Sequence, residues 1–169
     1  MKEHLIGVDK INTVLNKFLA EFEATACMGE DFCYWYKDSC IHYSLVMIEA
    51  SSDYFMQNFN RLAPDLHCDP FLASFMHELG HHETLDMIEE DYRPIKKALG
   101  EELKIVKDVL KSEIHQKYFD LPDEYEATMW AINYMRNNVE KVAAFWNELQ
   151  AAIINFYKLN KVEVDEYGC

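Results

Sequence analysis

The pattern His77-Glu78-Leu79-Gly80-His81 constrains this chain more than any other stretch of its sequence. On an α-helix, residues four positions apart lie about 40° apart around the axis and about 6 Å apart along it, so both imidazoles can bind one ion. The Glu beside the first His can reach a water molecule on that ion. This arrangement is typical of zinc hydrolases, in which the two His bind Zn²⁺ and the Glu is the general base.

The residues around this motif predict the helix that the pattern needs. Asp69 is suited to cap its start and Pro70 to occupy its first position, and we expect the helix to run to about Ile88. Gly80 lies inside it, where Gly costs up to about 1 kcal/mol relative to Ala. We therefore expect another backbone to approach closely at Gly80.

The segments before the motif predict one helix followed by a small sheet. Apolar residues recur at three- and four-residue steps between 5 and 25, as in an amphipathic helix. Residues 32–36 and 40–48 are rich in β-formers and are separated by a turn, which predicts an antiparallel hairpin. Residues 51–59 fit either a third strand or the start of a helix. An edge strand from the region 41–49 would bind an extended substrate by strand addition.

The segments after the motif are helical in pattern. We expect helices that start near Pro94 and near Asp120, a connection between them, and a last helix over about 139–159. The predicted fold is therefore α+β: a mostly helical, zincin-like domain with a small antiparallel sheet of two or three strands after the first helix. We expect one metallopeptidase-like domain over residues 1–169, in which 160–169 form an acidic tail.

Charge and composition exclude several kinds of partner. The formal net charge is −14, which argues against direct nucleic-acid binding and against an anionic membrane surface. No run approaches the roughly 20 apolar residues of a membrane span, and the N-terminus lacks the apolar stretch of a signal peptide. The five cysteines are odd in number and irregularly spaced, which is typical of reduced thiols in a cytoplasmic protein. Cys33 and Cys40 flank the predicted turn, and we interpret them as half-buried thiols rather than as a disulfide or a second metal site.

A stable catalytic zinc needs a third protein ligand. His82 points about 100° away from His81 around the helix, so we expect it at the helix surface or beside the ligands rather than on the ion. The spacing of a third His that defines metzincins is absent, because Thr84 and Met87 occupy the positions concerned. A Glu on a later helix remains. Residues 123–132 offer Glu124 and Glu126, of which only one can face the ion.

At this point the chain resembles the ImmA/IrrE family of zinc metallopeptidases, a minimal gluzincin-like family common in phages and mobile elements. The resemblance is carried by residues 77–81 and by Glu124-Tyr125-Glu126-Ala127-Thr128-Met129-Trp130-Ala131. It implies that His77, His81 and Glu124 are the zinc ligands and that Glu78 is the catalytic base. Thr128 stands where the family often has Asn or Asp, a position that commonly orients a ligand.

The resemblance also implies a function. We expect a zinc-dependent metalloendopeptidase that hydrolyses a peptide bond of a specific cytoplasmic protein, such as a transcriptional repressor, by means of a zinc-bound water that Glu78 activates. Thr128, Tyr125 and His82 are candidates for orienting the ligands or stabilising the oxyanion, and Tyr43, Tyr118 and Tyr134 are further candidates for the second of these roles. Oligomeric state is left open.

A second hypothesis belongs to another class of protein. The acidic chain could bind and inhibit another protein, as a phage factor that imitates the charge of nucleic acid would, with a metal site that is structural or vestigial.

Overall fold

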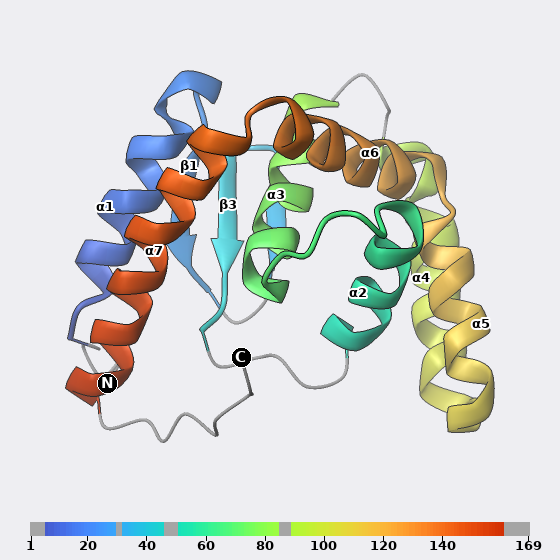
Figure 1. Cartoon of the computed structure of the whole chain (residues 1–169). Helices are drawn as coiled ribbons and strands as arrows, with labels where there is room; N and C mark the ends of the chain where they lie inside the picture. The colour runs from blue at the N-terminus through green and yellow to red at the C-terminus, as the bar shows by residue number, and fades with distance from the viewer. Residues whose placement is uncertain (1–5, 30–31, 46–50, 85–88, 161–169) are drawn as a thin grey trace.

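The computed structural model describes residues 6–29, 32–45, 51–84 and 89–160, and shows helices around a small sheet (Figure 1). The first helix is followed by the sheet and then by helices alone, which confirms the predicted α+β class. In chain order the elements are α1 (Val8–Leu19), the 3₁₀ turn η1 (Ala20–Phe22), β1 (Thr25–Met28), β2 (Cys33–Trp35), β3 (Cys40–Tyr43), α2 (Ser51–Leu62), α3 (Pro70–Glu83), α4 (Glu89–Ile105), α5 (Asp108–Phe119), α6 (Pro122–Asn137) and α7 (Val139–Asn160).

The sheet is mixed, whereas we expected an antiparallel one. Its strand order is β1-β3-β2, in which β3 pairs with β2 antiparallel and with β1 parallel. The predicted hairpin is therefore present, but β1 comes from residues that the sequence assigned to the end of the first helix. That helix stops earlier because Glu23 adopts a left-handed backbone conformation, with φ of 56°. The central strand is β3, so residues 40–43 form no sheet edge, and residues 46–49 lie outside the described ranges.

The outer edge of β1 is covered by a side chain of α1. Asn16 accepts a hydrogen bond from the backbone N–H of Ala26 at 2.8 Å and donates one to the carbonyl of the same residue at 3.3 Å. The amide thus imitates a neighbouring strand, and this pairing holds a strand of four residues that few local signals predict.

Several helix boundaries differ from those expected. Of the two alternatives for residues 51–59, the helix is present, as α2 over Ser51–Leu62. The helix α4 begins at Glu89, before the Pro94 that we expected at its start. The expected connection before α6 is itself the helix α5, which contributes few buried apolar side chains, such as Ile114 and Phe119, and so shows little periodicity. The predicted acidic tail falls almost wholly on residues 161–169, which lie outside the described ranges.

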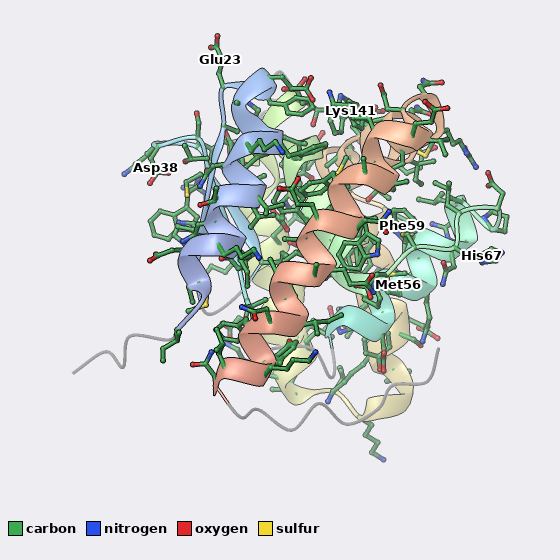
Figure 2. The ribbon with its side chains drawn as sticks, turned by 60° about the vertical axis from the view of Figure 1, so that its left-hand side comes forward. Glu23, Asp38, Met56, Phe59, His67 and Lys141 are labelled. Carbon is green, nitrogen blue, oxygen red and sulfur yellow. The ribbon has the colours of Figure 1, made fainter. Side chains whose placement is uncertain are left out.

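The core lies between the sheet, α3 and the long helices α1 and α7, which run side by side (Figures 1 and 2). Phe18 of α1 and Phe145 of α7 stack with ring centroids 4.0 Å apart, and Phe75 of α3 packs against Phe145. Phe59 of α2 is also fully buried, whereas the labelled Glu23 and Asp38 lie at the surface (Figure 2). These contacts place α3 in the interior of the molecule.

The helix α3 begins as its sequence predicts. The carboxylate of Asp69 accepts a hydrogen bond from the backbone N–H of Phe71 at 2.8 Å, and Pro70 occupies the first turn. The predicted close approach at Gly80 is also present, and the neighbour is α6. A Cβ atom on Gly80 would lie 2.2 Å from the carbonyl oxygen of Ala127 and 2.8 Å from its carbonyl carbon. The two helices therefore touch backbone to backbone at the motif.

Replacing Gly80 by Ala should destabilise the protein and weaken metal binding. Ala favours a helix over Gly by about 1 kcal/mol, but here its methyl group collides with a backbone that cannot rotate away, and overpacking costs about 1–3 kcal/mol. Gly100 of α4 is the matched control, because no atom lies within 4 Å of a Cβ built there. We expect Gly100→Ala to be neutral or stabilising in urea denaturation. Equal stability of the two variants would contradict the backbone contact.

Candidate metal centre

The first two candidate ligands project from one face of α3. His77 and His81 lie one helical turn apart, with ring centroids 4.6 Å apart. His77 is buried and packs against the ring of Phe55, with centroids 5.1 Å apart. The His81 side chain is 12% exposed. The wall of the site around His77 is therefore apolar, while His81 retains a path to solvent.

The structure brings Glu124, and not Glu126, to these imidazoles. Oε2 of Glu124 lies 3.1 Å from Nε2 of His77, and Oε1 lies 3.6 Å from Nε2 of His81. One ligand atom from each of the three residues lies within 4.8 Å of the other two. Glu126 is exposed to solvent on the other side of α6. Of the two acidic residues that the spacing left open, Glu124 is the one that can complete a metal site.

Burial alone would raise the pKa of the Glu124 carboxyl, because it disfavours the charged form. Hydrogen bonds to His77 and His81 and the interaction with their charge outweigh burial, and the pKa lies well below its ordinary value. Glu124 is therefore a carboxylate, which is the form that binds a metal.

Thr128 determines which nitrogen of His77 faces Glu124. The Thr128 hydroxyl donates its hydrogen to the carbonyl of Glu124 at 2.8 Å, one turn earlier on α6. With no second hydrogen to give, it can only accept from Nδ1 of His77, 3.0 Å away. Nδ1 therefore carries a proton, so in a neutral His77 ring Nε2 is the nitrogen that presents a lone pair. This is how an outer hydrogen bond fixes the tautomer of a metal-binding His.

The donor set fits a cation between the three residues. In this tautomer, Nε2 of His77 and Oε2 of Glu124 are both acceptors, yet they face each other at 3.1 Å. Two facing lone pairs repel unless a positive charge, either a proton or a metal ion, lies between them. Two imidazole nitrogens and one carboxylate form a ligand set that suits Zn²⁺ and other divalent transition metals.

Glu78 lies beside the ligands on α3 without joining them. The residue as a whole is half-buried, and its carboxyl accepts a hydrogen bond from the backbone N–H of Tyr34 on β2. Burial raises the pKa of Glu78 to about 7; the charge of His77 opposes this rise and that of Glu124 adds to it. The position and proton affinity suit a group that both takes and gives a proton near neutral pH.

A lysine and a second carboxylate lie on the far side of Glu124. Nζ of Lys96, on α4, lies 2.5 Å from Oε1 of Glu124 and 2.5 Å from Oδ2 of the buried Asp123. Burial alone would lower the pKa of Lys96, but the two carboxylates outweigh it and raise that pKa. Lys96 was not among the site residues predicted from the sequence. One signal was available: Lys96 is three residues before the buried Leu99 and shares its helix face.

Of the tyrosines considered as oxyanion donors, Tyr118 is the one beside the site. Burial raises its pKa most, the negative charges of Glu124 and Glu78 raise it further, and a hydrogen bond from its hydroxyl to the Glu124 carboxylate adds to the rise, so the hydroxyl keeps its hydrogen. Its ring also lies 5.4 Å from Nζ of Lys96. The Tyr43 hydroxyl donates a hydrogen bond to Asn12, and the Tyr134 hydroxyl donates one to Glu21. Both hydroxyls therefore bond to residues outside the site. Tyr125 is 39% exposed, and the structure gives it no contact with the ligands.

His82 joins neighbouring segments rather than the metal ligands. Its Nε2 donates to the carbonyl of Phe22 at 2.7 Å, and its Nδ1 therefore accepts from the hydroxyl of Tyr34 at 2.8 Å. The side chain ties α3 to η1 and to β2, so it positions the helix. Asp86, which follows the motif, lies outside the described residues.

The chain matches no protein-family model, no curated protein and no solved structure in the comparisons made with each. Similarity therefore assigns it to no family. Among the described residues, no helix has both the length and the apolar character that crossing a membrane requires.

Replacing Thr128 by Val should lower zinc affinity about 10- to 100-fold, as the loss of a hydrogen bond that orients a metal-binding His typically does. Val has nearly the shape of Thr but cannot accept the hydrogen of His77 Nδ1. Thr13→Val is the matched control, because the exposed Thr13 hydroxyl donates to the carbonyl of Asp9, one turn earlier, in the same way. A competition titration with a chromogenic zinc chelator measures both. Equal affinities would show that Thr128 does not orient His77.

Proposed function

We propose that this protein is a zinc-dependent metalloendopeptidase that cleaves a specific protein in the cytoplasm. The observation that carries the proposal is the convergence of His77, His81 and Glu124, from two helices, around one point beside Glu78. This combination is what a hydrolytic zinc site requires: three protein ligands and a carboxylate that is not a ligand. The likeness of residues 77–81 and 124–131 to the ImmA/IrrE family supports the same proposal and suggests a regulator, such as a repressor, as the substrate.

A zinc ion bound here would acidify a coordinated water and polarise the carbonyl of the scissile bond. Residues of the chain transfer the protons and orient the ligands. Glu78 accepts the proton of the attacking water and later donates it to the leaving amine, a task suited to a carboxyl whose pKa is about 7. Thr128 keeps the proton of His77 on Nδ1, away from the ligand position.

Tyr118 supplies a neutral donor near the place where negative charge develops. Its raised pKa keeps the phenol protonated, and its nearest charges are those of Glu124, Glu78 and Lys96. A protonated phenol can donate a hydrogen bond to an oxyanion without adding charge to the site.

We place an extended substrate along the side of β2 that faces away from β3. Among the described residues the sheet ends at β2, and on this side Tyr34 donates its backbone N–H to Glu78. A peptide that adds to this edge would run past the general base, with main-chain hydrogen bonds to the strand. This edge replaces the region 41–49 that the sequence suggested.

Replacing Glu78 by Gln should abolish hydrolysis and leave zinc binding intact. An amide cannot accept the proton, and general-base catalysis typically contributes about 10²- to 10⁴-fold to the rate. The zinc-loaded proteins are incubated with a library of unstructured peptides, and new termini are identified by mass spectrometry. Glu126→Gln, on the exposed side of α6, is the control and should cleave as the wild type does.

New termini that appear equally with wild type and with Glu78→Gln would come from a contaminant and would contradict the proposal. A zinc-loaded wild type that cleaves no peptide in the library, nor any protein that it binds in the cytoplasm, would also contradict it.

Replacing Tyr118 by Phe should lower kcat about 10²- to 10³-fold with little change in KM, as the loss of one oxyanion donor does. The ring and its contact with Lys96 are retained, so the fold should not change, and zinc content measured alongside separates the loss of the hydrogen bond to Glu124 from the loss of the oxyanion donor. Tyr125→Phe is the control and tests the exposed tyrosine that the sequence also suggested. If kcat falls in Tyr125→Phe and not in Tyr118→Phe, then Tyr118 is not the oxyanion donor.

The net charge of −14 favours one alternative, an acidic factor that binds and inhibits another protein. The Glu78→Gln variant separates the two functions, because it changes the chemistry of the site and leaves the acidic surface intact. A biological effect that survives this substitution would identify the protein as a binding factor.

A further inference from the structure

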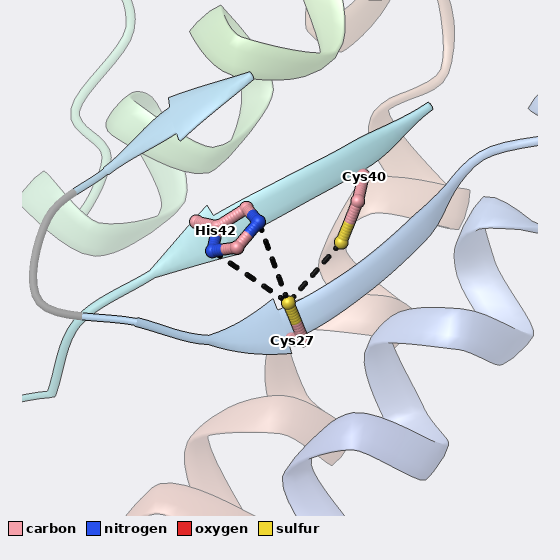
Figure 3. A group of neighbouring side chains, drawn as sticks. All are labelled: Cys27, Cys40 and His42. Carbon is pink, nitrogen blue, oxygen red and sulfur yellow. Dashed lines mark hydrogen bonds between the residues drawn. The ribbon is translucent and has the colours of Figure 1, made fainter. Parts of the chain in front are cut away.

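A second group of metal-binding side chains lies on the sheet, on the face turned away from α3. Ala26, Ile41 and Tyr43 point into the core, and the alternation of side chains along a strand turns their neighbours outward. These neighbours are Cys27 on β1 and Cys40 and His42 on β3 (Figure 3). Cys27 is the direct partner of His42 in the parallel register, and Cys40 precedes His42 by two residues on the same face.

The three side chains are close enough to share an ion. Sγ of Cys27 lies 3.2 Å from Sγ of Cys40 and 3.7 Å from each ring nitrogen of His42 (Figure 3). One ligand atom from each residue lies within 4.8 Å of the others. Around a tetrahedral zinc, two sulfurs are about 3.8 Å apart and a sulfur and a nitrogen about 3.5 Å apart, from ordinary bond lengths. The Cys27–Cys40 separation is thus about half an ångström shorter than in such a site, and the Cys27–His42 separation is close to the one expected.

The surroundings hold His42 in place. Nδ1 of His42 lies 3.1 Å from the position that a Cβ atom on Gly29 would take, so the ring occupies space that a larger residue would fill. On its other side the ring contacts the indole of Trp35, with centroids 5.0 Å apart. Trp35 is 53% exposed and covers part of the group from solvent. A ligand that is ordered before the metal arrives loses less entropy on binding.

We propose that Cys27, Cys40 and His42 bind a zinc ion at a site separate from that of His77, His81 and Glu124. Two thiolates and an imidazole are soft and borderline ligands that favour Zn²⁺ over Mg²⁺ or Ca²⁺. The ion would join β1 to β3 across the parallel pair. The proposal is independent of the peptidase activity.

Cobalt is the probe that separates the two sites. Co²⁺ bound by thiolates gives a strong ligand-to-metal charge-transfer absorption in the near ultraviolet, whereas Co²⁺ bound by imidazole and carboxylate does not.

The full chain is kept reduced and titrated with Co²⁺, and zinc content is then measured after exchange. The absorption should appear in wild type and in His77→Gln, and should be lost in Cys27→Ser and in His42→Ala. The partly buried Cys68 lies outside the group, so Cys68→Ser is the matched control and should retain the absorption.

The zinc content tests the same proposal without a spectrum. We expect two zinc ions per chain in wild type and one in either Cys27→Ser or His77→Gln, with circular dichroism to show that each variant is folded. Wild type without the charge-transfer absorption, or folded Cys27→Ser and His42→Ala variants that both retain it, would overturn the proposal. A Cys27–Cys40 disulfide that persists in the metal-supplemented protein after treatment with a reductant, seen as a mass lower by two hydrogens, would also overturn it.

Discussion

The backbone contact between Gly80 and Ala127 determines the geometry of the candidate metal centre. His77 and His81 can reach Glu124 and Thr128 only because α3 and α6 approach with no side chain between them at this point. A helix with Ala at position 80 would have to move away from the carbonyl of Ala127, which a Cβ atom would meet at 2.2 Å. Such a shift would separate the imidazoles from the carboxylate. The Gly that weakens α3 as an isolated helix is therefore what makes its pairing with α6 possible.

Burial of charge is the second constraint on this site. Asp123 and Glu124 are both buried, and an isolated carboxylate is expensive to remove from water. Lys96 lies between the two carboxylates, and the imidazoles contact Glu124 on its other side. One lysine cannot balance two carboxylates and the neighbouring Glu78, so the group remains short of positive charge. A divalent cation at His77, His81 and Glu124 would offset that deficit, and it would also remove the repulsion between two facing acceptors.

The parts of the structure that could be predicted from sequence are those that depend on local pattern. The start of α3 at Asp69 and Pro70, the shared face of His77 and His81, and the close approach at Gly80 all follow from helix geometry and from the cost of Gly in a helix. The position of Glu124 followed from a likeness of sequence, since spacing alone left Glu126 open.

The remaining features depend on contacts between distant segments. The strand β1 is short and is defined by pairing with β3 and with the Asn16 side chain, neither of which local propensity reveals. For the same reason the sequence analysis compared Cys33 with Cys40, whereas the parallel register places Cys27 beside Cys40 and His42. The proton on Nδ1 of His77 depends on a hydroxyl 51 residues away, whose own hydrogen is committed to Glu124. The hydrophobic periodicity of the sequence does not predict this contact between Thr128 and His77.

The strand β2 links the base of the candidate peptidase to the place where a substrate would bind. The backbone N–H of Tyr34 contacts Glu78, and its hydroxyl contacts His82, so one residue of the edge strand is fixed to α3 at two points. His82 in turn contacts the carbonyl of Phe22 and secures the same helix to η1. The distance between the strand edge and Glu78 therefore cannot vary without breaking hydrogen bonds. A peptide held on that edge would inherit this fixed position relative to the general base, which is the alignment that efficient hydrolysis requires.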